Sequence, residues 1–377
     1  MHIARIALEN WKNFSRVDVA CGMRVFLIGP NAAGKSNFLD ALRFMRDVTL
    51  HGLSKAVADL RGGVNAVRHA DARKNAGVTL ALDLDAGWRY LLSFGARARS
   101  GDAPLVFRET VVDPSGRTLL DRPDTDDRDD PPRLRQTALE QVFANRAFRD
   151  VAEFLAGIEY RSTLPQLVRE GRSLPVRTAD DDPFGGNLLA AIWNTPEKTR
   201  DARMRRIADV LRLAVPRLRD LRVVRDANGA PHFSAEYGDR RNAAHQDETS
   251  FSDGMLRLVA LLWALQGKGG PLLLEEPELS LHESVVALLP GFFAQIDADR
   301  KKVARQIFVT THADALLRDP GVGPGEVLRF APGGKGSVIE VASEEERMAM
   351  EAGGLTAADV LLPRTRPGDF GPAGWLE

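Results

Sequence analysis

The first fifty residues show a spacing of apolar side chains that predicts strands followed by a helix. Apolar and polar positions alternate over residues 3–19, interrupted by the polar stretch Asn10-Trp11-Lys12-Asn13, and this pattern indicates an opening hairpin. Residues 23–28 form a buried-strand run that leads directly into a glycine-rich loop. Apolar residues then recur at helical spacing, at Phe38, Leu39, Leu42 and Met45.

The middle of the chain predicts an antiparallel sheet and then helices. Alternating runs at 78–84, 88–94 and 106–112 indicate strands, because Gly, Asp or Pro bounds each of them. The stretch 121–132 is rich in Asp and Pro, so we expect an exposed or partly disordered loop. Helical patterns cover 137–156 and 201–215. Strands at 222–224 and 232–237 flank an Asn228-Gly229 turn.

The last third alternates helices with short apolar strands. We predict helices at 255–266 and 285–296, strands at 271–274 and 306–311, and a short helix at 344–350. This alternation is typical of a parallel sheet covered on both faces. The chain is therefore predicted to be an α/β protein with an N-terminal antiparallel β subdomain and a helical/β insertion.

The glycine-rich loop carries the strongest chemical motif. The sequence Gly29-Pro30-Asn31-Ala32-Ala33-Gly34-Lys35-Ser36 fits G-x-x-x-x-G-K-[ST] between a strand and a helix, which indicates a P-loop NTPase. Its backbone N–H groups would wrap phosphates, Lys35 would reach the terminal phosphates and Ser36 would bind Mg²⁺. The alternative is an ordinary glycine-rich turn. The predicted ATP-binding residues are Asn31, Ala32, Ala33, Gly34, Lys35, Ser36 and Asn37.

Two carboxylates follow the apolar strand at 272–274. Glu275 is predicted to bind Mg²⁺, and Glu276 to orient and deprotonate the attacking water. A pair of solvated glutamates at a strand end is the alternative. A site that hydrolyses a triphosphate needs a metal ligand and a water-positioning group as well as a P-loop. The catalytic interpretation of Glu275 and Glu276 is therefore favoured.

Two further segments are weaker candidates for contact with the nucleotide phosphates. Ser252 or Asp253 could cap the helix that follows, while Gly254 would let backbone N–H groups approach a phosphate. Capping alone would also explain this sequence. His312 follows the strand at 306–311 and could touch a γ-phosphate, although a histidine at a strand end is more often structural.

The order of these motifs resembles the ABC-type AAA ATPase heads of the RecF, SMC and OLD-like group. The resemblance covers residues 1–50 and about 250–330, including the start Glu9-Asn10-Trp11-Lys12-Asn13-Phe14. It implies that Ser252 and Gly254 form a signature motif that acts on ATP held by the opposite subunit, so that ATP drives homodimerisation. It also places the switch histidine at His312 and the D-loop at Glu278, Leu279 and Ser280.

The chain departs from that family's transporter branch. Glu275 replaces the usual Asp, Met255 stands where transporters usually have Gln, and no glutamine lies between Ser36 and Arg135 to serve as the Q-loop. His69 is a possible stand-in. The chain is too short for the coiled-coil arms of SMC proteins, and its C-terminal segment is too short for a fused nuclease.

Composition excludes several other classes. The net charge of −1 excludes a globally basic nucleic-acid binder, and the single cysteine, Cys21, excludes an intramolecular disulfide and leaves no cysteine pair for a thiolate metal site. Since neither a signal peptide nor an apolar run of membrane length occurs, we expect a cytoplasmic protein. Arginines between 203 and 225 could contact DNA or RNA phosphates, or could pair with nearby aspartates; the basic stretch 61–74 has the same ambiguity.

We predict an ATP-binding head at 1–50 plus 250–341, an inserted lobe at 51–249 and a tail at 342–377. The leading hypothesis is an ATPase whose ATP-gated dimerisation serves DNA repair and maintenance or anti-phage defence, with a nuclease or other effector as a possible partner. The alternatives are an ABC transporter ATPase subunit on a membrane partner, and a nucleotide-gated scaffold with little turnover.

Overall fold

The computed structural model describes residues 1–73, 75–96, 103–171, 182–238, 244–267, 269–298 and 305–365. The chain divides into two compact units. Unit 1 comprises Met1–Ile158, Gly269–Pro271 and Arg305–Glu377, and unit 2 comprises Glu159–Lys268 and Leu272–Ala304. The predicted tail beyond residue 365 lies outside the described residues, and the predicted division into head, lobe and tail stays a prediction.

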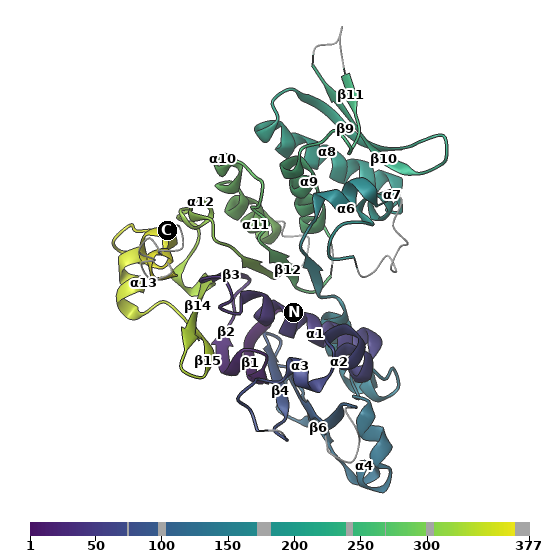
Figure 1. The fold of residues 1–377 in the computed structure, drawn as a ribbon, viewed down its shortest axis with the longest axis vertical. Coiled ribbons are helices and arrows are strands. Elements are labelled where there is room, and N and C mark those ends of the chain that lie inside the picture. The colour runs from purple at the N-terminus through teal and green to yellow at the C-terminus, as the bar shows by residue number, and fades with distance from the viewer. Residues whose placement is uncertain are drawn as a thin grey trace, which may run out of the picture. The chain divides into compact units, whose positions relative to one another are not determined.

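Unit 1 is built on a large mixed sheet (Figure 1). Its strands lie in the order β7-β6-β5-β4-β1-β2-β15-β14-β3-β13. Every neighbouring pair from β7 to β14 is antiparallel, whereas β14, β3 and β13 are parallel. The strands are β1 (Ile3–Trp11), β2 (Phe14–Ala20), β3 (Arg24–Ile28), β4 (Val78–Leu84), β5 (Arg89–Gly95), β6 (Leu105–Val112), β7 (Thr118–Arg122), β13 (Ile307–Thr310), β14 (Val327–Gly333) and β15 (Gly336–Glu340).

The α-helices of unit 1 are α1 (Lys35–His51), α2 (Leu53–Arg61), α3 (Val64–Val67), α4 (Thr125–Asp129), α5 (Arg149–Ala156), α12 (Asp314–Leu317), α13 (Glu344–Glu351) and α14 (Ala357–Val360). Short 3₁₀ turns lie at Pro131–Arg135, Ala144–Phe148, Pro324–Glu326 and Leu362–Thr365. Aromatic rings join α1 to the sheet. The ring of Phe44 lies 5.2 Å from Trp11 and 5.1 Å from Phe94, and Phe38 meets Phe330 at 5.7 Å. These buried rings fix the helix that follows the glycine-rich loop.

Unit 2 combines a parallel strand pair, a three-stranded antiparallel sheet and helices. β12 (Leu272–Glu275) pairs in parallel with β8 (Glu159–Arg161), and β10 (Pro231–Tyr237) lies between β9 (Leu218–Arg225) and β11 (Ala244–Gln246). Figure 1 shows α8 beside this second sheet. The helices are α6 (Pro165–Glu170), α7 (Leu188–Trp193), α8 (Glu197–Ala214), α9 (Asp253–Leu265), α10 (Glu283–Val286) and α11 (Leu289–Ala298).

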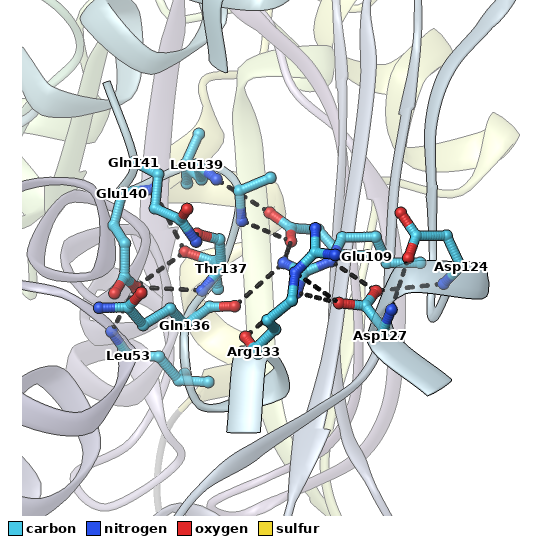
Figure 2. Close-up of polar contacts among 12 residues, drawn as sticks. Leu53, Glu109, Asp124, Asp127, Arg133, Gln136, Thr137, Leu139, Glu140 and Gln141 are labelled. Atoms are coloured by element: carbon cyan, nitrogen blue, oxygen red, sulfur yellow. Dashed lines mark hydrogen bonds and ion pairs between the residues drawn. The ribbon is translucent and has the colours of Figure 1, made fainter. Parts of the chain in front are cut away.

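The stretch 121–132 is largely exposed, as expected, but the expected loop is wrong because the stretch holds the end of β7, α4 and the start of a 3₁₀ turn. β7 ends at Arg122, α4 follows with a capping box at Asp124, and Asp127 is buried. The Arg122 guanidinium donates to both oxygens of Asp127, at 2.8 and 2.9 Å, and to Glu109 at 3.2 Å. A charged composition predicted solvated charges throughout, but Asp127 is buried and pairs with a buried arginine inside the fold (Figure 2).

The expected helix over 137–156 is wrong in its first half, because α5 begins only at Arg149. The preceding backbone turns toward a buried carboxylate. Glu109 accepts hydrogen bonds from the N–H groups of Ala138, at 2.7 Å, and Leu139, at 3.0 Å (Figure 2). The expected helix over 285–296 is likewise broken into α10 and α11. The other predicted elements are confirmed to within a few residues at their ends.

No helix in the described part of the chain has the length and apolarity needed to cross a membrane.

Candidate nucleotide site

The glycine-rich loop in unit 1 follows β3 and needs glycine at both of its ends. Gly29 has φ 147°, and a Cβ there would lie 2.4 Å from the carbonyl oxygen of Phe330. Gly34 has φ 101°, and a Cβ there would lie 2.1 Å from Nδ2 of Asn13. Ala32 also adopts positive φ, at 63°. The neighbouring strands therefore hold the loop in a backbone conformation that side chains at its glycines would not permit.

Lys35 begins α1 and its ammonium lies inside the loop. Nζ donates to the carbonyl oxygens of Gly29, at 2.8 Å, and Pro30, at 3.1 Å, and the residue is 6% exposed. The first turn of α1 holds no acidic side chain. A buried cation and the positive end of a 17-residue helix thus share one place, which favours binding of an anion.

Asn13, from the turn between β1 and β2, supports this loop from behind. Its Nδ2 donates to Ser337 Oγ at 2.7 Å and to the Ala33 carbonyl at 3.4 Å. Its Oδ1 accepts from Nδ2 of Asn37 at 2.8 Å. Asn37, a predicted ATP-binding residue, thus uses its side chain to bind Asn13. Exposed side chains in the loop belong to Asn31, Ala32 and Ser36.

His312 reaches the same edge of the unit 1 sheet as the loop. β13 runs parallel to β3, with Thr310 opposite Leu27. Both strands therefore end together, so the loop after Ile28 and the segment Thr311-His312 start side by side. Thr311 N donates to the Leu27 carbonyl at 3.2 Å, and His312 is exposed. The structure thus brings Lys35, Ser36 and His312 to one edge.

Unit 2 carries the two carboxylates at the end of β12. Glu275 accepts a hydrogen bond from the hydroxyl of Tyr160, which lies on the parallel neighbour β8. Glu276 adopts φ 43°, which is uncommon for a residue with a side chain. Strained backbone of this kind concentrates at functional sites, because the surrounding structure must hold it.

The segment 252–254 starts α9 in unit 2. Ser252 is the N-cap, and its Oγ accepts from Met255 N at 3.2 Å. A Cβ at Gly254 would lie 2.5 Å from the Ser280 carbonyl oxygen, so glycine is needed for this close approach. Ser280 itself has φ 63°. Ser252 therefore caps its helix, as the simpler interpretation expected, and Gly254 joins the helix start to the segment after Glu276.

Three residues near these motifs were not singled out as candidates from the sequence. Tyr160 binds Glu275, and Arg169 donates to the Phe251 carbonyl at 2.6 Å and to Asp253 at 2.7 Å. Arg257, on α9, has its pKa lowered because burial removes it from water, although Asp253 and Glu276 act in the opposite direction. The contacts of Tyr160 and Arg169 join residues 115 and 84 positions apart, so no local pattern reveals them.

Two arginines of the arginine-rich stretch in unit 2 form the ion pairs that the simpler interpretation predicted. Arg212 pairs with Asp209, and Arg222 with Asp220. Aromatic contacts were not expected there, yet the guanidiniums of Arg225, in the stretch, and of Arg200, just before it, lie 4.7 and 4.4 Å from the ring centroid of Trp193. In unit 1, the basic stretch begins with Arg61, whose guanidinium is bonded to Asp40 at 2.8 Å and paired with Asp47 at 2.9 Å.

No curated protein matches the chain. Solved structures of SMC head domains share its fold, among them the following two. One is the SMC head bound to the C-winged helix domain of ScpA, with 15% identity, 92% of this chain and 99% of that chain covered, and a TM-score of 0.54. The other is an SMC head domain with an extended coiled coil, bound to the C-terminal domain of ScpA, derived from Pyrococcus furiosus; it has 13% identity, 93% and 99% coverage, and a TM-score of 0.51. These likenesses confirm the predicted P-loop NTPase fold class.

A family model described as "AAA domain, putative AbiEii toxin, Type IV TA system" matches residues 24–318, more than half of the chain. The match includes the glycine-rich loop, both carboxylates and His312. The chain therefore belongs to this family of AAA domains, and its fold is that of SMC head domains.

Proposed function

We propose that this protein binds ATP with Mg²⁺ and hydrolyses it at a site that two copies of the chain form together. The observation that carries the proposal is the parallel pairing of β3 with β13, which brings the Lys35 ammonium and His312 to one edge of the unit 1 sheet. Triphosphate chemistry depends on positioning and on neutralising charge, and this edge offers a buried cation, helix N–H groups and an imidazole.

The oxygen donors proposed for the metal, Ser36 and Glu275, suit Mg²⁺ in a nucleotide complex. Within the described residues, no group of three or more His, Cys, Asp or Glu side chains could hold a metal by itself. Mg²⁺ usually takes one or two protein oxygens and completes its shell with phosphates and water. The hydroxyl of Ser36 and the carboxylate of Glu275 would be those oxygens. When bound, Mg²⁺ would neutralise charge on the phosphates.

Separate residues of the chain would bind the phosphates, activate the water and stabilise the departing phosphate. Lys35 would leave the carbonyls of Gly29 and Pro30 to bind the terminal phosphates. Glu276 would accept a proton from the attacking water, and its strained backbone would aim its carboxylate. His312 would donate a hydrogen bond to the departing phosphate. Ser252 and Gly254 would contribute the N-terminus of α9 to ATP bound by the other copy.

The proposal includes a homodimer that forms on ATP binding, in the cytoplasm, with the head formed by 1–50 and 250–341. The biological readout would be DNA repair and maintenance or anti-phage defence, with DNA and a nuclease or other effector as partners. Arginines stacked on Trp193 support a phosphate-bearing partner, because guanidinium and aromatic groups together suit nucleic acid.

Glu276→Gln tests the proposal. This variant should bind ATP, lose phosphate release and accumulate as a dimer on size exclusion with ATP. Lys35→Ala is the matched control and should stay monomeric, because it cannot bind the nucleotide. A Glu276→Gln protein that holds ATP as a monomer would exclude the two-copy site.

A further inference from the structure

A buried carboxylate lies four residues before Ser252 and ties the start of α9 to the three-stranded sheet of unit 2. Glu248 is 0% exposed. Its Oε1 lies 2.8 Å from Nδ1 of His232, and its Oε2 accepts from Phe233 N at 2.9 Å. Both partners belong to β10. The carboxylate therefore fixes the turn at 247–251 to one place along that strand.

Aromatic and polar contacts repeat this connection. Phe251, directly before Ser252, stacks on Phe233 with 5.8 Å between ring centroids and 27° between planes. Tyr237, also on β10, has its hydroxyl 3.2 Å from Sδ of Met255 on α9. Three side chains of β10, those of His232, Phe233 and Tyr237, thus contact the segment 248–255.

The sheet that bears these contacts is itself firmly paired. β10 pairs with β9 along its whole length, with Val224 opposite His232. Nε2 of His232 also lies 3.3 Å from Asp226, in the turn between the two strands. The imidazole therefore bridges two carboxylates, and any change in its position shifts Glu248 and the turn that leads to Ser252.

We propose that His232 and Glu248 are positioning residues for the signature motif, and set the place of Ser252 and Gly254 relative to the nucleotide of the second copy. This inference rests on the proposed two-copy site. A misplacement of about 1 Å can lower a rate about a hundredfold, so a buried hydrogen-bonded pair that anchors a helix start can control turnover without touching ATP.

The effect of these residues is on the partner's nucleotide and not on their own chain's P-loop. His232→Ala should lower the rate of phosphate release about tenfold or more while the Kd for ATP stays within about twofold. His232→Asn should restore much of the rate, because its amide nitrogen can take the place of Nδ1 and donate to Glu248. If His232→Ala does not fold, Glu248→Gln replaces it, since glutamine keeps the shape and removes the charge.

Mixing two impaired variants, His232→Ala and Glu276→Gln, tests the inference. A His232→Ala chain keeps its own Lys35 and Glu276, and a Glu276→Gln chain keeps its own signature motif. In a mixed dimer, one of the two sites combines the intact parts of both. Equal mixing makes about half of the dimers mixed, so the mixture should reach about a quarter of the wild-type rate.

A control mixture separates this inference from the proposed function. Ser252→Arg blocks the signature motif directly, and its mixture with Glu276→Gln should also recover activity. If the Ser252→Arg mixture recovers and the His232→Ala mixture does not, the positioning role is wrong and the two-copy site stands. If neither mixture recovers, the two-copy site falls, and the inference with it.

A second control concerns the sheet itself. Val224→Ala removes an exposed side chain, directly opposite His232 on the paired strand. This variant should keep the wild-type rate. A tenfold loss in Val224→Ala would contradict the inference, because general weakening of the sheet would then explain the effect of His232→Ala.

Discussion

The side-chain amide of Asn13 packs directly against Gly34. A Cβ on Gly34 would lie 2.1 Å from Nδ2 of Asn13 and 2.8 Å from Cζ of Phe14, and the φ of Gly34 is 101°. The residue before Lys35 must therefore be glycine for two separate reasons. One is the left-handed backbone, and the other is the hairpin turn packed behind the loop.

Gly34→Ala should disrupt the phosphate loop. Left-handed backbone costs alanine about 1–2 kcal/mol, and the clash with Asn13 must also be relieved by moving the loop. We expect the Kd for ATP to rise at least about tenfold, since the N–H groups at the start of α1 would move. Calorimetric titration with ATP measures this change.

Gly116→Ala is the matched control for Gly34→Ala. Gly116 also has positive φ, at 84°, but no atom would lie within 4 Å of its Cβ. This control should lose about 1–2 kcal/mol of stability and keep the wild-type Kd for ATP. Equal ATP binding by the Gly34→Ala variant and the wild type would contradict the role given to the close packing.

Arg122→Leu should strongly destabilise unit 1. Arg122 lies between Glu109 and Asp127, all three residues are buried, and Arg122→Leu removes the buried cation that both carboxylates share. Breaking a buried pair from one side costs about 3–5 kcal/mol. Urea unfolding measures the loss. Arg108→Leu, which removes a well-exposed partner of Asp121, should cost less than about 1 kcal/mol.

Asp127 should make stability depend on pH in the acidic range. The hydrogen bonds from Arg122 lower the pKa of Asp127 to about 2. A carboxyl group whose folded pKa lies below its unfolded value of about 3.9 stabilises the fold above that value, and the stabilisation is lost as pH falls toward 2. The urea midpoints of wild type and Asp127→Asn should therefore differ most at pH 6 and converge as pH falls below about 4. A constant difference from pH 6 to pH 3 would contradict this account.

The contribution of Glu109 to stability changes with pH in the opposite direction to that of Asp127. Burial raises the pKa of Glu109, despite hydrogen bonds from Tyr90, Ala138 and Leu139. A raised folded pKa means that this group's contribution to stability falls as pH rises through that range. Using Asp127→Asn as the reference removes this effect from the comparison, since Glu109 is present in both proteins.

These same residues mark the limit of what local sequence patterns predict. Alternation correctly predicted β4 to within a residue, because one face of that strand is buried and the other is not. The charges of 121–132 resemble those of a solvated loop, and only the fold brings Glu109 beside Arg122. Composition cannot detect a partner 13 positions away that shares the interior.

The candidate site shows the same contrast. Lys35 and His312 were predicted from a short motif and a strand end, and the parallel pairing of β3 and β13 places them together. Glu248 gave no signal, because a lone glutamate in the sequence Asp247-Glu248-Thr249 resembles any polar turn. Its role depends on His232, which lies on a different element 16 positions earlier.

Cys21 should be inert to thiol reagents in the folded protein. It is the single cysteine of the chain, and burial raises its pKa to about 12. At pH 8 the group is therefore a thiol and not the reactive thiolate. We expect no release of thionitrobenzoate from the native protein and one equivalent after unfolding in urea, so Cys21 also reports on unfolding. Rapid reaction of the native protein would contradict the burial of this side chain.

His312→Ala should slow ATP hydrolysis while nucleotide binding is retained. His312 lies at the end of β13, next to the loop, and Lys35 and α1 remain intact without it. Removing a group that stabilises charge on the departing phosphate lowers kcat about 10²-fold, and the Kd for ATP should change less than about threefold. Steady-state phosphate release and ATP titration measure the two quantities. His51→Ala, at the other end of α1, is the control and should keep the wild-type kcat. A His312→Ala protein with full kcat would assign His312 to the structural role that is commoner for a histidine at a strand end.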